Sequence, residues 1–151
     1  FRTAEDDGDA GPLALLWRIC KGLFLLNDQR LSERLLRRDV FRDVLGILEY
    51  DEGLPEEQRI AHRQIHSTQV RFNEVVAFEE GETLERIHLV YRLQYVKDIV
   101  FPRLMDDEAA AAMTHMVHSN LSVVLERMHN SEALIDAVLE RVWQRDLQGL
   151  R

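Results

Sequence analysis

Apolar residues cover almost every side of the helix that the stretch from Thr83 to Pro102 predicts. They form two stripes at helical spacing, Leu84, Ile87, Tyr91 and Tyr95 along one and Leu89, Leu93, Val96 and Val100 along the other. A surface helix needs only one such stripe, so a helix with two must be covered on more than one side. The pattern predicts a central helix that ends or kinks at Pro102, which has no backbone N–H to donate.

Shorter amphipathic segments surround this helix and alternate with capping residues and turns. We expect helices over residues 12–26, 29–38, 40–50, 60–69, 108–120 and 121–128, and a last one from residue 131. Asp28 and Asp39 are placed to cap two of them, and Asp106 opens another. A break is expected near Ser119 and Asn120. The weakly alternating segment RFNEVVAF, residues 71–78, predicts an extended or irregular stretch.

The succession of short helices with little strand pattern predicts an all-α fold. Helix hairpins of this size favour an irregular armadillo/HEAT-like stack of helix pairs. Residues 1–11, FRTAEDDGDAG, are polar and acidic, and we expect them to form a disordered lead-in without signal-peptide character. The folded domain is then expected to span residues 12–151.

Composition excludes several classes of function. The net charge of −8 argues against direct nucleic-acid binding, because phosphates repel an acidic surface. No apolar run approaches the roughly 20 residues that cross a membrane, so no membrane association is expected. Cys20 is the single cysteine and lies in an apolar segment without a base nearby, which favours packing over nucleophilic chemistry. No cofactor is expected.

Two histidine patterns resemble metal sites. His62 and His66 are four residues apart, but a zinc-protease helix needs Glu directly after the first His, and this chain has Arg63. The pairs Glu85–His88 and Glu126–His129 both read Glu-x-x-His, a motif of di-iron helical bundles.

A di-iron bundle also needs an inward Glu from each of two further helices. Glu33 and Glu49 are available, yet neither lies on an obvious inward stripe. A di-metal carboxylate bundle therefore stays a remote alternative, and we expect no catalytic and no metal-binding residue. The sequence is interpreted as that of a protein that is not an enzyme.

A basic run concentrates five arginines within thirteen residues. On one continuous helix they would share a broad face, where guanidinium groups bind carboxylates and phosphates in a bidentate manner. The run predicts a dock for an acidic or phosphorylated segment; the alternative is a solvated face that Glu33, Asp39 and Asp43 neutralise locally. The five residues are Arg30, Arg34, Arg37, Arg38 and Arg42.

Four segments resemble one known family in the right order. They are KGLFLLND at Lys21–Asp28, DVLGILEYDE at Asp43–Glu52, IAHRQIHSTQVRFNEVVAF at Ile60–Phe78 and IHLVYRLQYVKDIVFP at Ile87–Pro102. They are similar to the central helical domain of the SMEK/Falafel family, regulatory subunit 3 of protein phosphatase 4. The resemblance spans roughly residues 13–145 and departs at His66, where the family has an aliphatic or similar residue, and at Ala77, where it has proline.

The resemblance implies a non-catalytic scaffold with an armadillo/HEAT-like fold. Family members join a phosphatase 4 catalytic subunit and a second regulatory subunit. They steer the enzyme toward phosphoprotein substrates of the DNA-damage response and mitosis. The resemblance also implies a nuclear and cytoplasmic location. The EVH1 domain of the family, which reads short proline-containing motifs, is not in this sequence.

We therefore interpret the chain as an interaction domain that binds a partner or substrate peptide to target dephosphorylation. The predicted peptide-binding surface surrounds the central helix and the HRQIH segment, because Tyr and Arg make rigid, directed anchors. Its residues are His62, Arg63, Arg71, Tyr91, Arg92 and Tyr95. One alternative is that His88, Tyr91 and Tyr95 are buried and bond internally. The other is a structural role as a spacer or self-association module.

Overall fold

A computed structural model describes the chain except for residues 69–80, 103 and 150–151. Within the described residues it contains helices and no strand, so the predicted all-α class is confirmed. The armadillo/HEAT-like stacking stays a prediction. The α-helices are α1 (Arg2–Asp6), α2 (Ala10–Leu25), α3 (Gln29–Leu35), α4 (Phe41–Leu48), α5 (His62–Thr68), α6 (Glu82–Tyr95), α7 (Asp107–His129) and α8 (Glu132–Gly149).

Local capping chemistry sets several of these boundaries. The side chain of Asp28 accepts a hydrogen bond from the backbone N–H of Leu31, and that of Asp106 accepts one from Ala109, as predicted. Asn27 takes a left-handed conformation at φ 55°, which allows the sharp turn between α2 and α3. The caps at Asp28 and Asp106 could be predicted from the sequence because each depends on residues within one helical turn.

Two boundary predictions are wrong. Asp39 does not cap α4, because its carboxylate forms an ion pair with Arg37 and α4 begins after Val40 without a side-chain cap. No break interrupts α7 at Ser119 and Asn120. The buried Asn120 amide donates to the carbonyl of Met116 within the same helix, and its side-chain oxygen accepts from Arg86 of α6.

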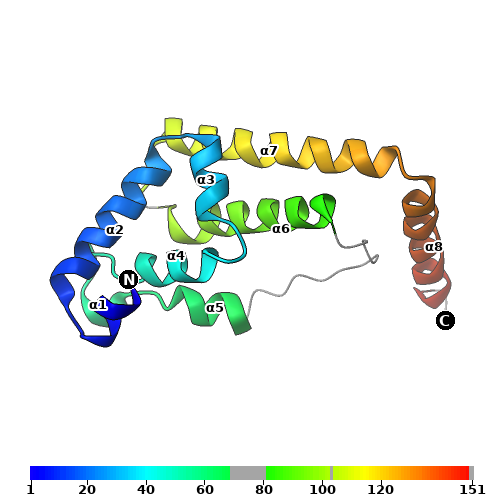
Figure 1. The fold of residues 1–151 in the computed structure, drawn as a ribbon. Coiled ribbons are helices and arrows are strands. Elements are labelled where there is room, and N and C mark those ends of the chain that lie inside the picture. The colour runs from blue at the N-terminus through cyan, green and yellow to red at the C-terminus, as the bar shows by residue number, and fades with distance from the viewer. Residues whose placement is uncertain (69–80, 103, 150–151) are drawn as a thin grey trace.

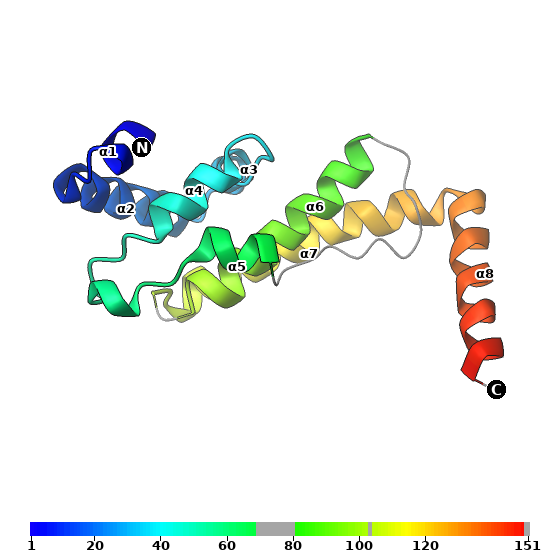
Figure 2. The same ribbon diagram turned by 90° about the horizontal axis from the view of Figure 1, so that it is seen from below.

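The central helix α6 is covered on two sides, as its sequence predicts. It lies antiparallel to α7 along most of its length (Figures 1 and 2). On that side Leu93 and Val96 join the core with residues of α7 such as Met113 and Val117. On the other side α4 and α5 approach it, and Tyr95 contacts both His62 and His66 of α5.

A single π turn, Val96–Val100 (η2), continues α6. The N–H of Phe101 bonds to the carbonyl of Val96, one residue further back than in an α-helix, at 3.0 Å. Phe101 then packs edge-on against Phe24 of α2 with ring centroids 5.3 Å apart. The helix ends before Pro102, as predicted.

The N-terminal residues correct the expected disordered lead-in. They form α1, which lies near the C-terminal end of α4 (Figure 1). Glu5 accepts hydrogen bonds from Arg63 of α5 and from Tyr50, and Arg2 pairs with Asp43 of α4. The acidic composition of residues 1–11 did not predict this helix, because Arg63, which pairs with Glu5, lies far away in the sequence.

Gly46 allows this close approach of the N-terminus to α4. The ring of Phe1 lies over it, and a Cβ added at this position would be 2.6 Å from the Cζ of Phe1. The guanidinium of Arg63 lies 5.7 Å from the centre of the same ring. A larger side chain at position 46 would therefore displace Phe1 from α4.

Helix α8 stands apart from the rest of the domain. It follows the far end of α7 and turns away from the other helices (Figures 1 and 2). Leu139, Val142 and Trp143 are exposed on it, Trp143 to 71%. By contrast, Trp17 and Cys20 of α2 are buried in the core, and burial raises the pKa of the Cys20 thiol to about 12. Cys20 is thus held as a neutral packing group, as its surroundings in the sequence predicted.

We predict that Arg63→Ala lowers the free energy of unfolding by about 1–3 kcal/mol. The change leaves the carboxylates of Glu5 and Glu49 without their shared partner, and Glu49 is only 14% exposed. Urea denaturation followed by circular dichroism measures the loss. Arg18→Ala is the matched control, because it breaks an exposed pair with Glu52 and should cost only about 0–1 kcal/mol. Equal losses in the two variants would contradict a structural role for the Arg63 cluster.

Candidate functional site

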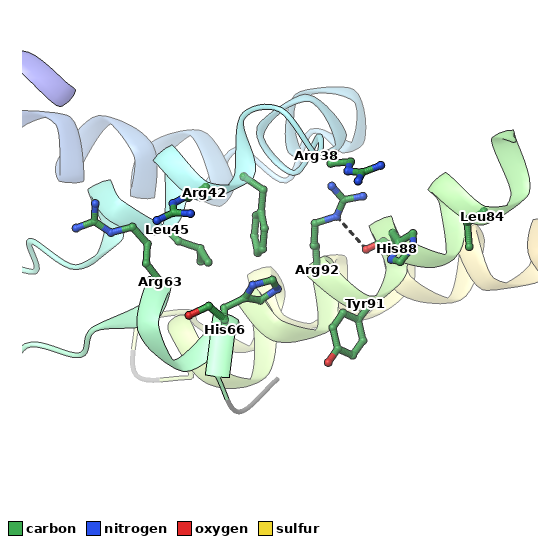
Figure 3. Close-up of a pocket in the computed structure, with 11 residues that line it drawn as sticks. Arg38, Arg42, Leu45, Arg63, His66, Leu84, His88, Tyr91 and Arg92 are labelled. Carbon is green, nitrogen blue, oxygen red and sulfur yellow. Dashed lines mark hydrogen bonds between the residues drawn. The ribbon is translucent and has the colours of Figure 1, made fainter. Parts of the chain in front are cut away.

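A cavity of about 500 Å³ lies between α4, α5 and the N-terminal half of α6 (Figure 3). Three helices and the turn before α4 contribute its walls, with aromatic, aliphatic and basic side chains intermixed. The residues that line it are Arg38, Phe41, Arg42, Leu45, Arg63, His66, Ser67, Leu84, His88, Tyr91 and Arg92.

The cavity exists because α4 and α5 contact only part of α6. Near the end of α6, the ring of His66 packs edge-on against both Phe41 and Tyr95, with ring centroids 5.1 and 5.3 Å away. Toward the start of α6 the described residues leave an open space beside the helix. Leu84 and Tyr91, which belong to the same apolar stripe as Tyr95, are therefore only half-buried.

A second cavity of about 420 Å³ adjoins the first, and Arg92 lines both. It lies between α3 and the start of α6, with Leu36 and Leu89 as its apolar wall. Its charged residues are of both signs: Arg30, Glu33, Arg34, Arg37, Glu82, Glu85, Arg86 and Arg92.

His62 and Tyr95 do not reach either of these cavities. Both are buried, the Tyr95 hydroxyl donates to the carbonyl oxygen of His62, and it lies 3.4 Å from the Nδ1 of the same residue. Burial raises the pKa of Tyr95 to about 12. The internal role that the sequence left as an alternative therefore describes Tyr95, and the prediction that these two residues form an accessible binding surface is wrong.

Arg63 lines the first cavity only with its aliphatic stem. Its guanidinium points away from the cavity (Figure 3), where it donates to Glu5 and Glu49. Hydrogen bonds to these carboxylates raise the pKa of Arg63, so its charge is fixed and already neutralised. Arg63 thus supports the cavity wall and supplies no free charge to a ligand.

Arg92 forms the floor between the two cavities. Its Nε donates to the carbonyl of His88 at 3.0 Å, and its guanidinium lies 6.0 Å from the ring centre of Phe41 (Figure 3). The exposed Glu85 is its ionic partner at 3.6 Å. Burial is the main cause of the lowered pKa of Arg92, and the nearby charge of Arg38 lowers it further.

The five arginines of the basic run do not share one helix. Helix α3 ends at Leu35, and Arg37 and Arg38 lie in the turn that leads to α4. Arg38 and Arg42 line the first cavity, whereas Arg30, Arg34 and Arg37 line the second. The run therefore borders both cavities and does not form the broad face that one continuous helix would give.

Five predicted site residues line the first cavity, Arg63 with its aliphatic stem alone; the other four are Arg38, Arg42, Tyr91 and Arg92. Sequence reasoning missed Phe41, Leu45 and Leu84, because an apolar residue on a helix predicts packing and not a cavity wall. Arg71, a predicted site residue, and the segment 71–78 lie outside the described residues.

The di-metal alternative finds no site in the described part of the chain. No group of three or more His, Cys, Asp or Glu side chains there is placed to hold a metal ion. Glu33 bonds to Gln29 and Asn120, and Glu49 bonds to Arg63. Nor does any helix described here combine the length and apolar character that would carry it across a membrane.

We predict that the domain loses stability as the pH falls from 7.5 to 5.5. Burial is the main cause of the lowered pKa of His62 and of His66, and Arg92 lowers that of His66 further. Below about pH 6.5 the unfolded chain binds protons that the folded chain does not, so the free energy of unfolding falls, by at most about 1.4 kcal/mol per pH unit for each histidine. This window lies above the range in which the lowered pKa of Glu5 matters.

Urea denaturation at several pH values measures this dependence. His62→Gln should flatten it, whereas His115→Gln, at an exposed position on α7, should not. A pH dependence that is the same in both variants would contradict the assignment to buried histidines.

Comparisons with known proteins agree with the resemblance noted in the sequence. The family model described as phosphatase 4 regulatory subunit 3 matches residues 1–148. "Suppressor of Mek1" from Dictyostelium discoideum is 31% identical over 143 residues, 94% of this chain and 14% of that protein. "Serine/threonine-protein phosphatase 4 regulatory subunit 3" from Eremothecium gossypii is 28% identical over 138 residues, 91% of this chain and 16% of that protein.

No solved structure matches the chain. The chain spans about one sixth or less of the length of these two curated relatives. The family match covers nearly every residue, including α1, which the sequence had assigned to a disordered lead-in. The chain therefore belongs to the phosphatase 4 regulatory subunit 3 family.

Proposed function

We propose that this domain is a non-catalytic interaction module that binds a short peptide segment of a partner or substrate in the cavity between α4, α5 and α6. The observation that carries the proposal is the cavity itself, a concave site with a few directed polar groups on apolar walls. Its volume falls within the roughly 300–1,000 Å³ typical of ligand sites. In the full-length protein, peptide binding would bring phosphatase 4 to the bound protein.

The shape and lining of the site favour an extended peptide. The two cavities flank the same stretch of α6 and share Arg92, so a ligand that crosses α6 at this residue would meet both recesses. The half-buried Leu84 offers apolar surface in the first, and the half-buried Leu89 in the second. Side chains that alternate along an extended segment would enter such recesses in turn.

The wider role rests on the family. We propose that the whole protein assembles with the phosphatase 4 catalytic subunit and a second regulatory subunit, and that its substrates are phosphoproteins. A nuclear and cytoplasmic location and a part in the DNA-damage response belong to the same proposal. The relative named as a phosphatase 4 regulatory subunit supports this assignment, and the chain described here supplies one segment of that assembly.

We predict that Tyr91→Ala and Leu84→Glu each weaken peptide binding about tenfold or more, because both remove anchoring surface in the cavity. The probe is a random library of twelve-residue peptides displayed on phage, followed by fluorescence anisotropy of the enriched sequences. Leu15→Glu is the control, since Leu15 is 53% exposed on α2 and does not line the cavity. Circular dichroism checks that the variants fold. No enriched peptide, or equal affinity in all variants, would overturn the proposal.

Self-association is a second candidate function, and one observation favours it. Helix α8 exposes Ile135, Leu139, Val142 and Trp143, which lie at helical spacing. If two copies of this helix pair, light scattering should show a mass that rises with concentration, and Leu139→Glu should abolish the rise. A concentration-independent monomer would contradict self-association and leave a spacer as the remaining structural role.

A further inference from the structure

Positive charge dominates the first cavity in a chain that is acidic overall. The chain carries a net charge of −8, yet no aspartate or glutamate is among the described residues that line this cavity. Its arginines are Arg38, Arg42, Arg63 and Arg92, and only Arg63 has its charge fully taken up by carboxylates. The remaining positive charge faces the space that a ligand would occupy.

Two of these arginines have no ionic partner among the described residues. Arg38 and Arg42 are exposed and form no ion pair there, although their neighbours Arg37 and Asp43 each do. Arg30 and Arg34 continue the same four-residue spacing along the second cavity and also lack ionic partners in the described chain. Four guanidinium groups along the border of the two cavities thus form no ion pair in the described part of the chain.

Arg92 of α6 adds a third guanidinium to those of Arg38 and Arg42 in the first cavity. Its side chain is 8% exposed, and the guanidinium of Arg38 lies near it across the cavity (Figure 3). Burial is the main unfavourable influence on the charge of Arg92; Glu85, at 3.6 Å and more than half exposed, acts favourably, and the charge of Arg38 is a smaller unfavourable contribution. Like charges held this close favour an anion between them.

We propose that the cavity binds the phosphate of a phosphoserine or phosphothreonine in the bound peptide, held by Arg38 and Arg92, with Arg42 at the mouth. This inference rests on the proposed function and names the chemistry that the same site recognises. A phosphate monoester carries close to two negative charges and three acceptor oxygens at neutral pH. It therefore matches two guanidinium forks better than a carboxylate, which carries one charge and two oxygens.

The surroundings of the arginines favour a peptide over other phosphates. The recess behind them is walled by Leu45 and Leu84, which suits neighbouring side chains of a peptide and not a flat lipid surface. The acidic side chains Glu82 and Glu85 border the adjoining cavity on α6 and would repel a nucleic-acid backbone or an anionic membrane. A single phosphate on an otherwise neutral or mixed segment fits this distribution of charge.

The experiment compares three degenerate peptide libraries, each with five random residues on either side of a fixed central phosphoserine, serine or glutamate. Binding to the domain is measured by fluorescence anisotropy at physiological salt. We expect the phosphoserine library to bind about tenfold or more tightly than the serine library, and the glutamate library to fall between them. Phenyl phosphate should compete with the phosphoserine library.

Arg38→Gln should remove the preference for phosphoserine, because Arg38 is exposed and its loss does not disturb the core. Arg18→Gln is the matched control: it removes the same charge from an exposed residue of α2, which pairs with Glu52 and is not among the residues that line either cavity. It should leave the preference intact. Arg92→Lys keeps the charge but removes the fork, and should reduce the preference if the variant folds.

The outcomes separate this inference from the proposed function. Equal binding of the three libraries, weakened by Tyr91→Ala, would overturn phosphate recognition and leave peptide binding in place. Loss of the preference in Arg18→Gln to the same extent as in Arg38→Gln would show an effect of general charge and overturn the site. Binding of adenosine monophosphate as tight as that of the phosphoserine library would overturn a peptide ligand. No binding of any library would overturn both proposals.

Discussion

The two-sided burial of α6 is the constraint on which the rest of the domain depends. One face of this helix joins the core with α7, and the other meets the ends of α4 and α5. A helix with apolar side chains on both faces has no stable position at the surface, so its neighbours must assemble around it. Where α4 and α5 fall short of covering its second face, the cavity appears.

The position of α4 and α5 in turn depends on Arg63. This residue joins α5 to Glu49 at the end of α4 and to Glu5 in α1, so three segments share one guanidinium. Such a cluster is costly to break because each removed partner leaves charges that are partly shielded from water. The cavity wall is therefore held by electrostatics on one side and by apolar packing on the other. The same division explains why Arg63, although a predicted ligand contact, is a structural residue.

Local features were predictable from the sequence, and features that need distant partners were not. The caps at Asp28 and Asp106 and the end of α6 before Pro102 follow from residues within one turn. Asp39 failed as a cap because the side chain of Arg37 competes for it. The order of α1 and the continuity of α7 at Asn120 depend on contacts across 58 and 34 positions of the chain, which periodicity does not report.

The candidate site shows the same limit. The basic run and the central helix were separate features in the sequence, and the fold brings Arg38 and Arg42 of the one beside Tyr91 and Arg92 of the other. Residue type indicated their chemistry, but only the tertiary arrangement shows which arginines already have partners. His62 and Tyr95 illustrate the opposite case. They were predicted to bind a ligand, but in the core they bond to each other.

The π turn at Val96–Val100 fixes the direction in which the chain leaves the central helix. A π turn contains one residue more than a regular helical turn, so everything after it is rotated by about 100° relative to an uninterrupted α-helix. That rotation directs Phe101 toward Phe24 while Tyr91 and Arg92 keep facing the cavity. Loss of one residue between positions 96 and 100 would restore a regular helix and uncouple the cavity from the core of α2. The domain should therefore tolerate an insertion or a deletion within these five positions less well than one in the loop between α4 and α5.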